Sequence, residues 1–201
     1  MKKTKNIIKA FGYFTACLIC FFGTAGKLPK LRPIPWVTHD AVLFLQEYMR
    51  ENPDAKVLEF GSGASTLWFA SKTPNLVSVE HSLPWYNKIK RLLKNSTKYH
   101  PVNYILHKRP YYCVCDQFPD ESFDLILVDG RNRKGCIKHS IRILKEGGVL
   151  MVDNAERHYY RAALKLLKDW QGVKTVQTRP DSCGFTYNNW QTRWYIKPIS
   201  E

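Results

Sequence analysis

The sequence predicts an α/β fold built on a doubly wound, mostly parallel sheet. Short β-rich runs alternate with helical stretches along the chain, a glycine turn joins the first run to a helix, and no helix separates the last two runs. Alternation of strand and helix implies right-handed crossovers between parallel strands. The last pair, without a helix between its members, predicts antiparallel strands that close one edge of the sheet.

Local patterns justify each element in order. Thr38 can cap a first helix that extends to about Arg50, because its apolar residues fall on one face. Short runs rich in β-forming residues then predict strands at Lys56–Phe60, Leu76–Glu80, Val102–Leu106, Phe123–Val128 and Val149–Val152. The helical stretches that separate or follow them are Ser65–Ser71, Pro84–Asn95, Lys134–Leu144 and His158–Trp170. The antiparallel pair is predicted at Val173–Thr178 and Thr192–Ile196.

Length and charge divide the chain into two parts. Its 201 residues, with 44% hydrophobic and 13% aromatic side chains, indicate one globular domain rather than a disordered or collagen-like chain. Residues 1–32 hold seven Lys or Arg and no acid, which is half of the formal net charge of +14. We therefore expect a basic N-terminal segment at 1–32 and a folded domain at 33–201. No nucleic-acid-binding motif accompanies the charge, so nucleic acid is not an expected partner.

The N-terminal segment contains an uncharged run of 17 residues, Ala10 to Gly26. This length is at the lower limit for a helix that crosses a bilayer. Small residues at Gly23 and Ala25 also fit the cleavage site of a signal peptide. We expect a membrane-associated protein with a single N-terminal anchor, and secretion after cleavage of a signal peptide is the alternative. The side of the membrane is left open.

A glycine turn follows the first predicted strand. Gly61 permits a backbone angle that most residues resist, and Gly63 lets a ligand approach the main chain beside Ser62. The helix that begins near Ser65 and Thr66 offers free backbone N–H groups to a ligand. The turn is therefore a candidate cofactor site, and a plain tight turn is the alternative.

Two carboxylates flank this turn. Glu59 precedes Gly61 by two residues, where a negative charge would repel the diphosphate of NAD or FAD but suits the ammonium and sulfonium charges of S-adenosylmethionine. Glu80 ends the second strand, where an acid can accept hydrogen bonds from both ribose hydroxyls, and His81 could flank the adenine. The pair indicates an adenosylmethionine site, with an exposed strand end as the alternative for Glu80.

Four segments carry a family resemblance: EFGSGAST, SVEH, FDLILVDG and LKEGGVLMVDN. Together they resemble the class I S-adenosylmethionine-dependent methyltransferases between Trp36 and Trp194, and the wordings EFGSG-STLWFA and VDGRNR are similar to a bacterial-type branch of that superfamily. The resemblance implies a Rossmann-like sheet of seven strands with an antiparallel C-terminal edge strand, and S-adenosylmethionine as cofactor. The superfamily often has a third glycine where this chain has Ser65.

Polar residues follow the fourth and fifth predicted strands: Asp129, and Asp153 with Asn154. The carboxyl ends of the strands are the ligand side of an open α/β sheet, so we expect these residues to be catalytic. They resemble the set with which catechol-type and caffeoyl-CoA-type O-methyltransferases hold a divalent metal, which implies Mg²⁺ beside a substrate hydroxyl. Those families have a lysine where this chain has Asn132. Alternatively, Asp129 contacts the cofactor or a substrate amine, and Asp153 and Asn154 form a turn.

Three further residues are candidates for substrate binding. Arg131 and Arg133 follow Asp129 and could hold a carboxylate or phosphate, since guanidinium binds both in bidentate fashion. Trp190 lies in an aromatic cluster on which a sugar or aromatic acceptor could stack. Exposed loop charge is the alternative for the arginines, and ordinary strand packing is the alternative for the tryptophan.

These observations favour a membrane-tethered methyltransferase that acts on an oxygen of a small molecule or glycan. A non-catalytic S-adenosylmethionine-binding or interaction module is the second hypothesis, and an NAD-dependent oxidoreductase is the third. The charge of Glu59 argues against the NAD-dependent oxidoreductase. The intact set of carboxylates and glycines argues against the non-catalytic module.

Overall fold

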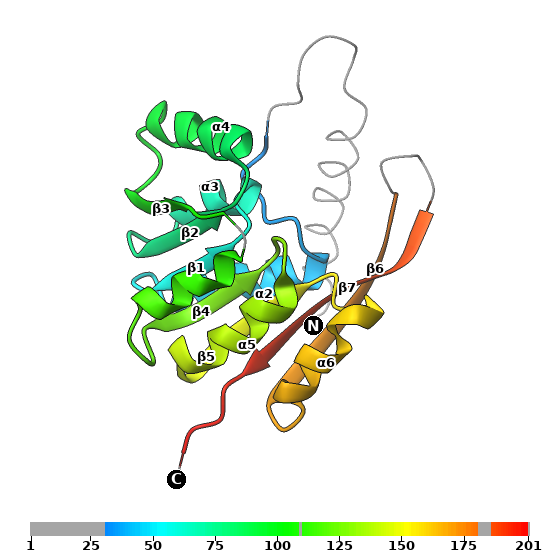
Figure 1. The fold of residues 1–201 in the computed structure, drawn as a ribbon. Coiled ribbons are helices and arrows are strands. Elements are labelled where there is room, and N and C mark those ends of the chain that lie inside the picture. Colours follow the sequence, from blue (N-terminus) through cyan, green and yellow to red (C-terminus); the bar gives the residue numbers. More distant parts are fainter. Residues whose placement is uncertain (1–30, 109, 181–185, 201) are drawn as a thin grey trace, which may run out of the picture.

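A seven-stranded mixed sheet forms the centre of the protein in this computed structural model, which describes residues 31–108, 110–180 and 186–200 (Figure 1). The strands lie in the order β3-β2-β1-β4-β5-β7-β6. Their bounds are β1 Val57–Phe60, β2 Leu76–Glu80, β3 Val102–Leu106, β4 Phe123–Val128, β5 Leu144–Asp153, β6 Gln171–Pro180 and β7 Thr186–Ile196. Strands β1 to β5 pair in parallel, whereas β7 is antiparallel to both of its neighbours, β5 and β6. The predicted Rossmann-like sheet with an antiparallel C-terminal pair at one edge is confirmed.

Helices cover both faces of this sheet (Figure 1). One face carries α2 (His39–Glu51), α3 (Ala64–Ala70) and α4 (Leu83–Lys94). The other carries η1 (Tyr111–Gln117), α5 (Arg133–Ile143), η2 (His158–Tyr160), α6 (Arg161–Leu164) and η3 (Lys165–Leu167). Each face of the sheet has its own hydrophobic core, and alternate strand residues pack into one or the other. Val57 packs toward α2 and α3, and its neighbour Leu58 packs toward α5. Burial on both faces explains the nearly continuous apolar strands in the sequence.

Several elements differ from their predicted bounds. Strand β7 begins at Thr186 rather than Thr192, and β6 extends from Gln171 to Pro180 rather than from Val173 to Thr178. The helix predicted at His158–Trp170 is divided into η2, α6 and η3, which follow one another without a gap. Strand β5 begins at Leu144 rather than Val149, and its pairing with β4 is irregular near its start. Gly147 in that stretch has a φ of 70°, a backbone angle that interrupts a regular strand.

Strand register brings the ends of four strands together. Phe60 of β1 pairs with Val79 of β2 and with Val128 of β4, and Val128 pairs with Val152 of β5. The residues that follow these positions share one end of the sheet: Gly61, Glu80, Asp129 and Asp153. The chain leaves β1 for β2 on one side and reaches β4 on the other, so β1 and β4 form the switch point at which open α/β sheets bind ligands.

The predicted membrane anchor, Ala10 to Gly26, lies outside the described residues. In the part of the chain that the structure describes, no helix has both the length and the apolar character needed to cross a bilayer.

Candidate active site

A cavity of about 990 Å³ opens where β1, β2, β4 and β5 end. Its walls come from the turn after β1, the end of β2, the loop after β4 and the segment 154–160 after β5. This volume is in the range of small-molecule sites. The predicted site residues that line it are Gly61, Ser62, Gly63, Ser65, Glu80, His81, Asp129, Arg131, Arg133 and Asn154. The predicted residues Glu59, Thr66, Asp153 and Trp190 lie behind its wall.

The two glycines of the turn have different physical roles. Gly61 has a φ of 97°, and a Cβ atom there would lie 2.5 Å from the Cα atom of Gly130 in the loop after β4. Gly63 has an extended φ of 175°, and a Cβ atom there would meet nothing within 4 Å. Gly61 is therefore required by the fold of the turn, whereas the space beside Gly63 is open to a ligand.

Substituting each glycine with alanine should separate folding from binding. Gly61→Ala combines a strained φ with a backbone clash, and we expect it to lower the free energy of unfolding by about 1–3 kcal/mol. Gly63→Ala should leave that free energy nearly unchanged and weaken cofactor binding, because its methyl group enters the open space. Urea denaturation and calorimetry with S-adenosylmethionine would measure the two effects. An equal loss of stability in both variants would contradict this assignment.

Glu80 connects the end of β2 to the glycine turn. Its Oε2 accepts hydrogen bonds from the Ser62 backbone N–H at 3.1 Å and from the Ser62 hydroxyl at 3.0 Å. Its Oε1 accepts from the backbone N–H groups of His81 and Ser82, both at 2.8 Å. The carboxylate lines the cavity with only 4% of its side chain exposed. Glu80 therefore shapes the cavity wall and presents its charge at that wall.

Glu59 lies beneath the turn and does not face the cavity. Its Oε2 accepts from the hydroxyls of Thr66 at 2.5 Å and Ser78 at 2.6 Å, and the Thr66 oxygen accepts from the Gly63 N–H at 2.8 Å. Its Oε1 has no hydrogen-bond partner among the described residues. Complete burial raises the pKa of Glu59 to about 7, although these hydroxyls favour the charged form. Glu59 holds the turn from behind the cavity wall and, contrary to the prediction, does not line the cavity.

The raised pKa of Glu59 should make stability depend on pH. The folded protein keeps a proton on Glu59 that the unfolded chain releases above the ordinary glutamate pKa of 4.5, so this contribution is complete below pH 4.5 and is lost as pH rises through about 7. We expect Glu59→Gln to remove a pH-dependent change of up to about 3 kcal/mol in the free energy of unfolding. Urea denaturation between pH 4.5 and 8 would measure it, with Glu47→Gln on the exposed face of α2 as the control. Identical pH profiles for Glu59→Gln and wild type would contradict the prediction.

Arg133 joins the two aspartates at the ends of β4 and β5. Its Nη2 lies 2.9 Å from Asp129 Oδ1, its Nη1 lies 3.7 Å from Asp153 Oδ2, and it also donates to the backbone oxygens of Asp129, Gly130 and Asp153. Only 7% of the Arg133 side chain is exposed. Burial raises the pKa of Asp129 well above its usual range and raises that of Asp153, and the guanidinium opposes both shifts. The arginine is a buried counter-ion rather than a free substrate clamp.

The carboxylates at this end of the sheet do not fit a divalent metal. Asp153 Oδ1 accepts hydrogen bonds from Trp190 Nε1 and Thr192 Oγ1, both at 2.8 Å, and its Oδ2 faces Arg133. A metal ion shared by Asp129 and Asp153 would meet the guanidinium charge that already lies between them. Within the described residues, no group of three His, Cys, Asp or Glu side chains is placed to hold a metal. Mg²⁺ was an expectation that these contacts do not support.

Asn154 offers the cavity an unused hydrogen-bond donor. It has a left-handed φ of 51° immediately after β5, and it lines the cavity with 5% of its surface exposed. Its Nδ2 is buried and has no hydrogen-bond partner among the described residues. A buried amide without a partner is costly, so a ligand atom that accepts a hydrogen bond is expected there.

The two remaining substrate-binding candidates, Arg131 and Trp190, lie in different environments. Arg131 is exposed and lines the cavity, where it can meet an acidic group. Trp190 is 2% exposed and lies within the sheet, where its indole supports Asp153. Its position matches the strand-packing alternative.

Sequence reasoning missed the role of Tyr104, and the structure places two further aromatic residues, Trp85 and Tyr160, at the cavity. Tyr104 on β3 places its hydroxyl 2.6 Å from the Ser62 hydroxyl. Trp85 donates its indole N–H to the Ser62 carbonyl at 2.6 Å, and Tyr160 lies beside the Arg133 guanidinium. No local motif distinguishes these aromatic residues from core packing, so only their placement beside the cavity reveals them.

Part of this chain matches a known protein family, and its fold is similar to that of several solved structures. Residues 58–155 match a family model described as a methyltransferase domain. An O-methyltransferase from Bacillus cereus, in complex with SAH, has a TM-score of 0.60 at 17% identity and covers 98% of this chain and 93% of its own. The cofactor-bound protein Rv0187 from MTB has a TM-score of 0.63 at 18% identity, with coverage of 99% and 100%. A precorrin-6y C5,15-methyltransferase from Geobacter metallireducens has a TM-score of 0.55 at 20% identity, with coverage of 88% and 94%.

At these identities the structural likeness concerns the fold. No curated protein is similar enough in sequence to give a match. The matched segment contains all of β1 except Val57, the glycine turn and the ends of β2, β4 and β5, which are the elements that build the cavity. Residues 58–155 therefore match a methyltransferase domain, and the whole described chain has the Rossmann-like fold of the S-adenosylmethionine-dependent methyltransferases to which it is similar.

Proposed function

We propose that this protein transfers the methyl group of S-adenosylmethionine to an oxygen atom of a small molecule. The observation that carries the proposal is that one cavity joins the glycine turn and Glu80 to Asp129 and Asn154. The similarity in fold to the Bacillus cereus O-methyltransferase supports an oxygen acceptor. A glycan acceptor has no support from the similar proteins.

Cofactor binding is assigned to the turn and to Glu80. The open backbone at Gly63 would lie beside the amino-acid part of the cofactor, and Glu80 would accept hydrogen bonds from the ribose. The Ser62 hydroxyl, which now donates to Glu80, lies 2.6 Å from the Tyr104 hydroxyl and can turn toward it when a ribose arrives. This exchange would free a lone pair on Glu80 without leaving Ser62 unpaired.

The chemical step is assigned to Asp129 and Asn154. When bound, S-adenosylmethionine supplies an electrophilic methyl group on a sulfonium, and alignment of the acceptor is the main requirement. Asn154 would donate a hydrogen bond to the acceptor and orient its hydroxyl. Asp129 would take the hydroxyl proton as the new oxygen–carbon bond forms and the sulfur keeps the electron pair of the broken bond. Burial raises the pKa of Asp129, which makes it a stronger base, and Arg133 holds it in place.

Calorimetry and a labelled-methyl screen test this proposal together. We expect S-adenosylmethionine and adenosylhomocysteine to bind, NAD not to bind, and label to appear on a hydroxylated acceptor. Asp129→Asn should keep cofactor affinity and lose at least about a hundredfold in turnover. Binding of NAD alone would refute the proposal. Tight cofactor binding without transfer to any acceptor would favour a non-catalytic binding module.

We also propose that residues 1–32 attach the enzyme to a membrane and that residues 33–201 form the catalytic domain. The apolar run from Ala10 to Gly26 supports the attachment. Membrane fractionation of the full chain, followed by protease protection, tests it and reports the side. Recovery of a soluble form that lacks residues 1–25 would support a cleaved signal peptide instead.

A further inference from the structure

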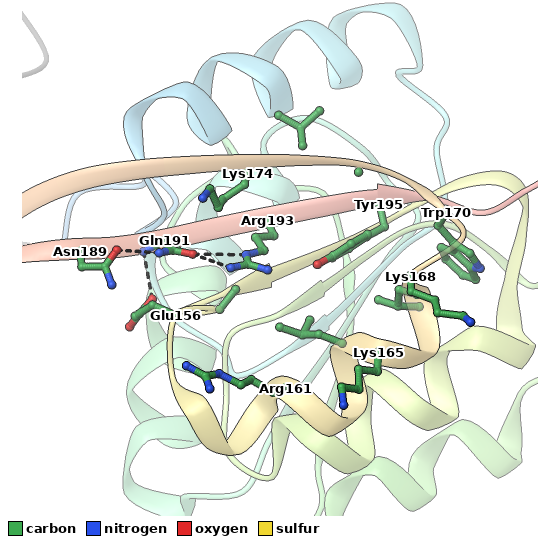
Figure 2. A pocket seen from close by; sticks show the side chains of 15 residues that line it. Glu156, Arg161, Lys165, Lys168, Trp170, Lys174, Asn189, Gln191, Arg193 and Tyr195 are labelled. Atoms are coloured by element: carbon green, nitrogen blue, oxygen red, sulfur yellow. Dashed lines mark hydrogen bonds between the residues drawn. The ribbon is translucent and has the colours of Figure 1, made fainter.

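A second cavity, of about 700 Å³, lies between the α6–η3 run and the β6–β7 pair, away from the glycine turn (Figure 2). Arg161, Lys165 and Lys168 follow one another at helical spacing along one wall. Lys174 and Arg193 are paired residues of β6 and β7, so their side chains lie on one face of the opposite wall. We call these five side chains the basic groove.

Most of the positive charge of the basic groove is not balanced by a nearby carboxylate. Within the described residues, no carboxylate lies within 4.0 Å of the charged groups of Arg161, Lys165, Lys174 or Arg193. Lys168 lies 3.9 Å from Asp169, and both of those side chains are largely exposed. Glu156 is the acid that lines the cavity, and it is 4% exposed with its Oε2 accepting the Gln191 N–H at 3.0 Å.

Neutral side chains hold Arg193 in a defined orientation. Its Nη2 and Nε donate to Gln191 Oε1 at 2.8 and 3.3 Å, and Gln191 Nε2 donates in turn to Asn189 Oδ1 at 2.6 Å (Figure 2). This chain of hydrogen bonds orients the guanidinium and adds no negative charge. A partly buried cation fixed in this way favours an anion from outside the protein.

From this geometry we propose that the basic groove binds a small ligand carrying two or more phosphate groups. Cations on both walls match negative charges spaced along a ligand, and lysine ammonium groups suit phosphate as point charges. The volume fits a small molecule rather than a macromolecule. The site is separate from the cavity at the glycine turn, because the two share no lining residue.

Calorimetry of the full-length protein with inorganic tripolyphosphate tests the proposal. Adenosylhomocysteine is kept at saturation so that the first cavity is filled. Lys165→Gln/Lys174→Gln removes one exposed cation from each wall, and we expect it to weaken binding about tenfold. Lys94→Gln/Lys138→Gln removes two exposed lysines on α4 and α5 and should bind as wild type does. Binding should also weaken between 50 and 200 mM salt, as expected for charge pairing.

Three results would overturn the proposal. The first is no binding of tripolyphosphate to wild type, and the second is an equal affinity of the groove variant and the control variant. The third is tighter binding of a tricarboxylate or of oligothymidylate than of tripolyphosphate. Tighter binding of the tricarboxylate would identify a carboxylate ligand, and tighter binding of oligothymidylate would identify single-stranded nucleic acid. Unchanged circular dichroism of the groove variant would exclude misfolding as the cause of a loss.

Discussion

Arg133→Met should lower the free energy of unfolding by about 3–5 kcal/mol at pH 8, because it leaves the buried carboxylate of Asp153 and the partly exposed carboxylate of Asp129 without their counter-ion. The guanidinium contacts both Asp129 and Asp153 and donates to three backbone oxygens around them. Its removal should raise the pKa of both carboxyls further, so the loss should be smaller at pH 5 than at pH 8. Urea denaturation at the two pH values would measure both effects.

Arg131→Met is the matched control, since Arg131 is an exposed cation two residues away in the same loop. It should change the free energy of unfolding by no more than about 0.5 kcal/mol. Comparable losses in the two variants would contradict the counter-ion role of Arg133.

Arg133→Met also tests whether Arg133 keeps a metal ion from binding between the two aspartates. Mg²⁺ or EDTA should leave the melting temperature of wild type unchanged, because the guanidinium occupies the space between the aspartates. Mg²⁺ should raise the melting temperature of Arg133→Met, in which that space is free beside Asn154. A rise with Mg²⁺ in wild type would show that the arginine moves aside for the ion.

Glu80→Ala should weaken S-adenosylmethionine binding by about 2–3 kcal/mol, which is more than tenfold in affinity. The substitution removes the proposed acceptor of the ribose hydroxyls. It also removes the acceptor that ties the turn to β2 through Ser62, His81 and Ser82. Calorimetry with S-adenosylmethionine and with adenosylhomocysteine would measure the loss.

Ser62→Ala separates the two roles of Glu80. It removes the hydroxyl that donates to the carboxylate and keeps the backbone N–H, so we expect a smaller loss of affinity than for Glu80→Ala. An unchanged affinity in Glu80→Ala would remove Glu80 from the cofactor site. An equal loss in both variants would assign the effect to the turn rather than to contact with the ribose.

The positions of the strands and of the cofactor turn could be predicted because they depend on local properties. Buried parallel strands such as Phe123–Val128 are nearly continuous apolar runs, and Gly61 adopts the positive φ that a glycine turn requires. The irregular start of β5 could not be predicted in the same way. It depends on pairing with Phe123 of β4 across a register shift, which the sequence around Leu144 does not encode.

By itself, the sequence determined the doubly wound sheet, the glycine turn and the strand ends at which Glu80, Asp129 and Asp153 meet, since periodicity and backbone angles are local. Only the tertiary structure decided the partners of the charges. Glu59 is buried against α3, Arg133 joins two strand ends, and Asp153 accepts hydrogen bonds from residues 37 and 39 positions further along the chain. Such pairings depend on sheet order and packing between distant segments, which no local pattern specifies.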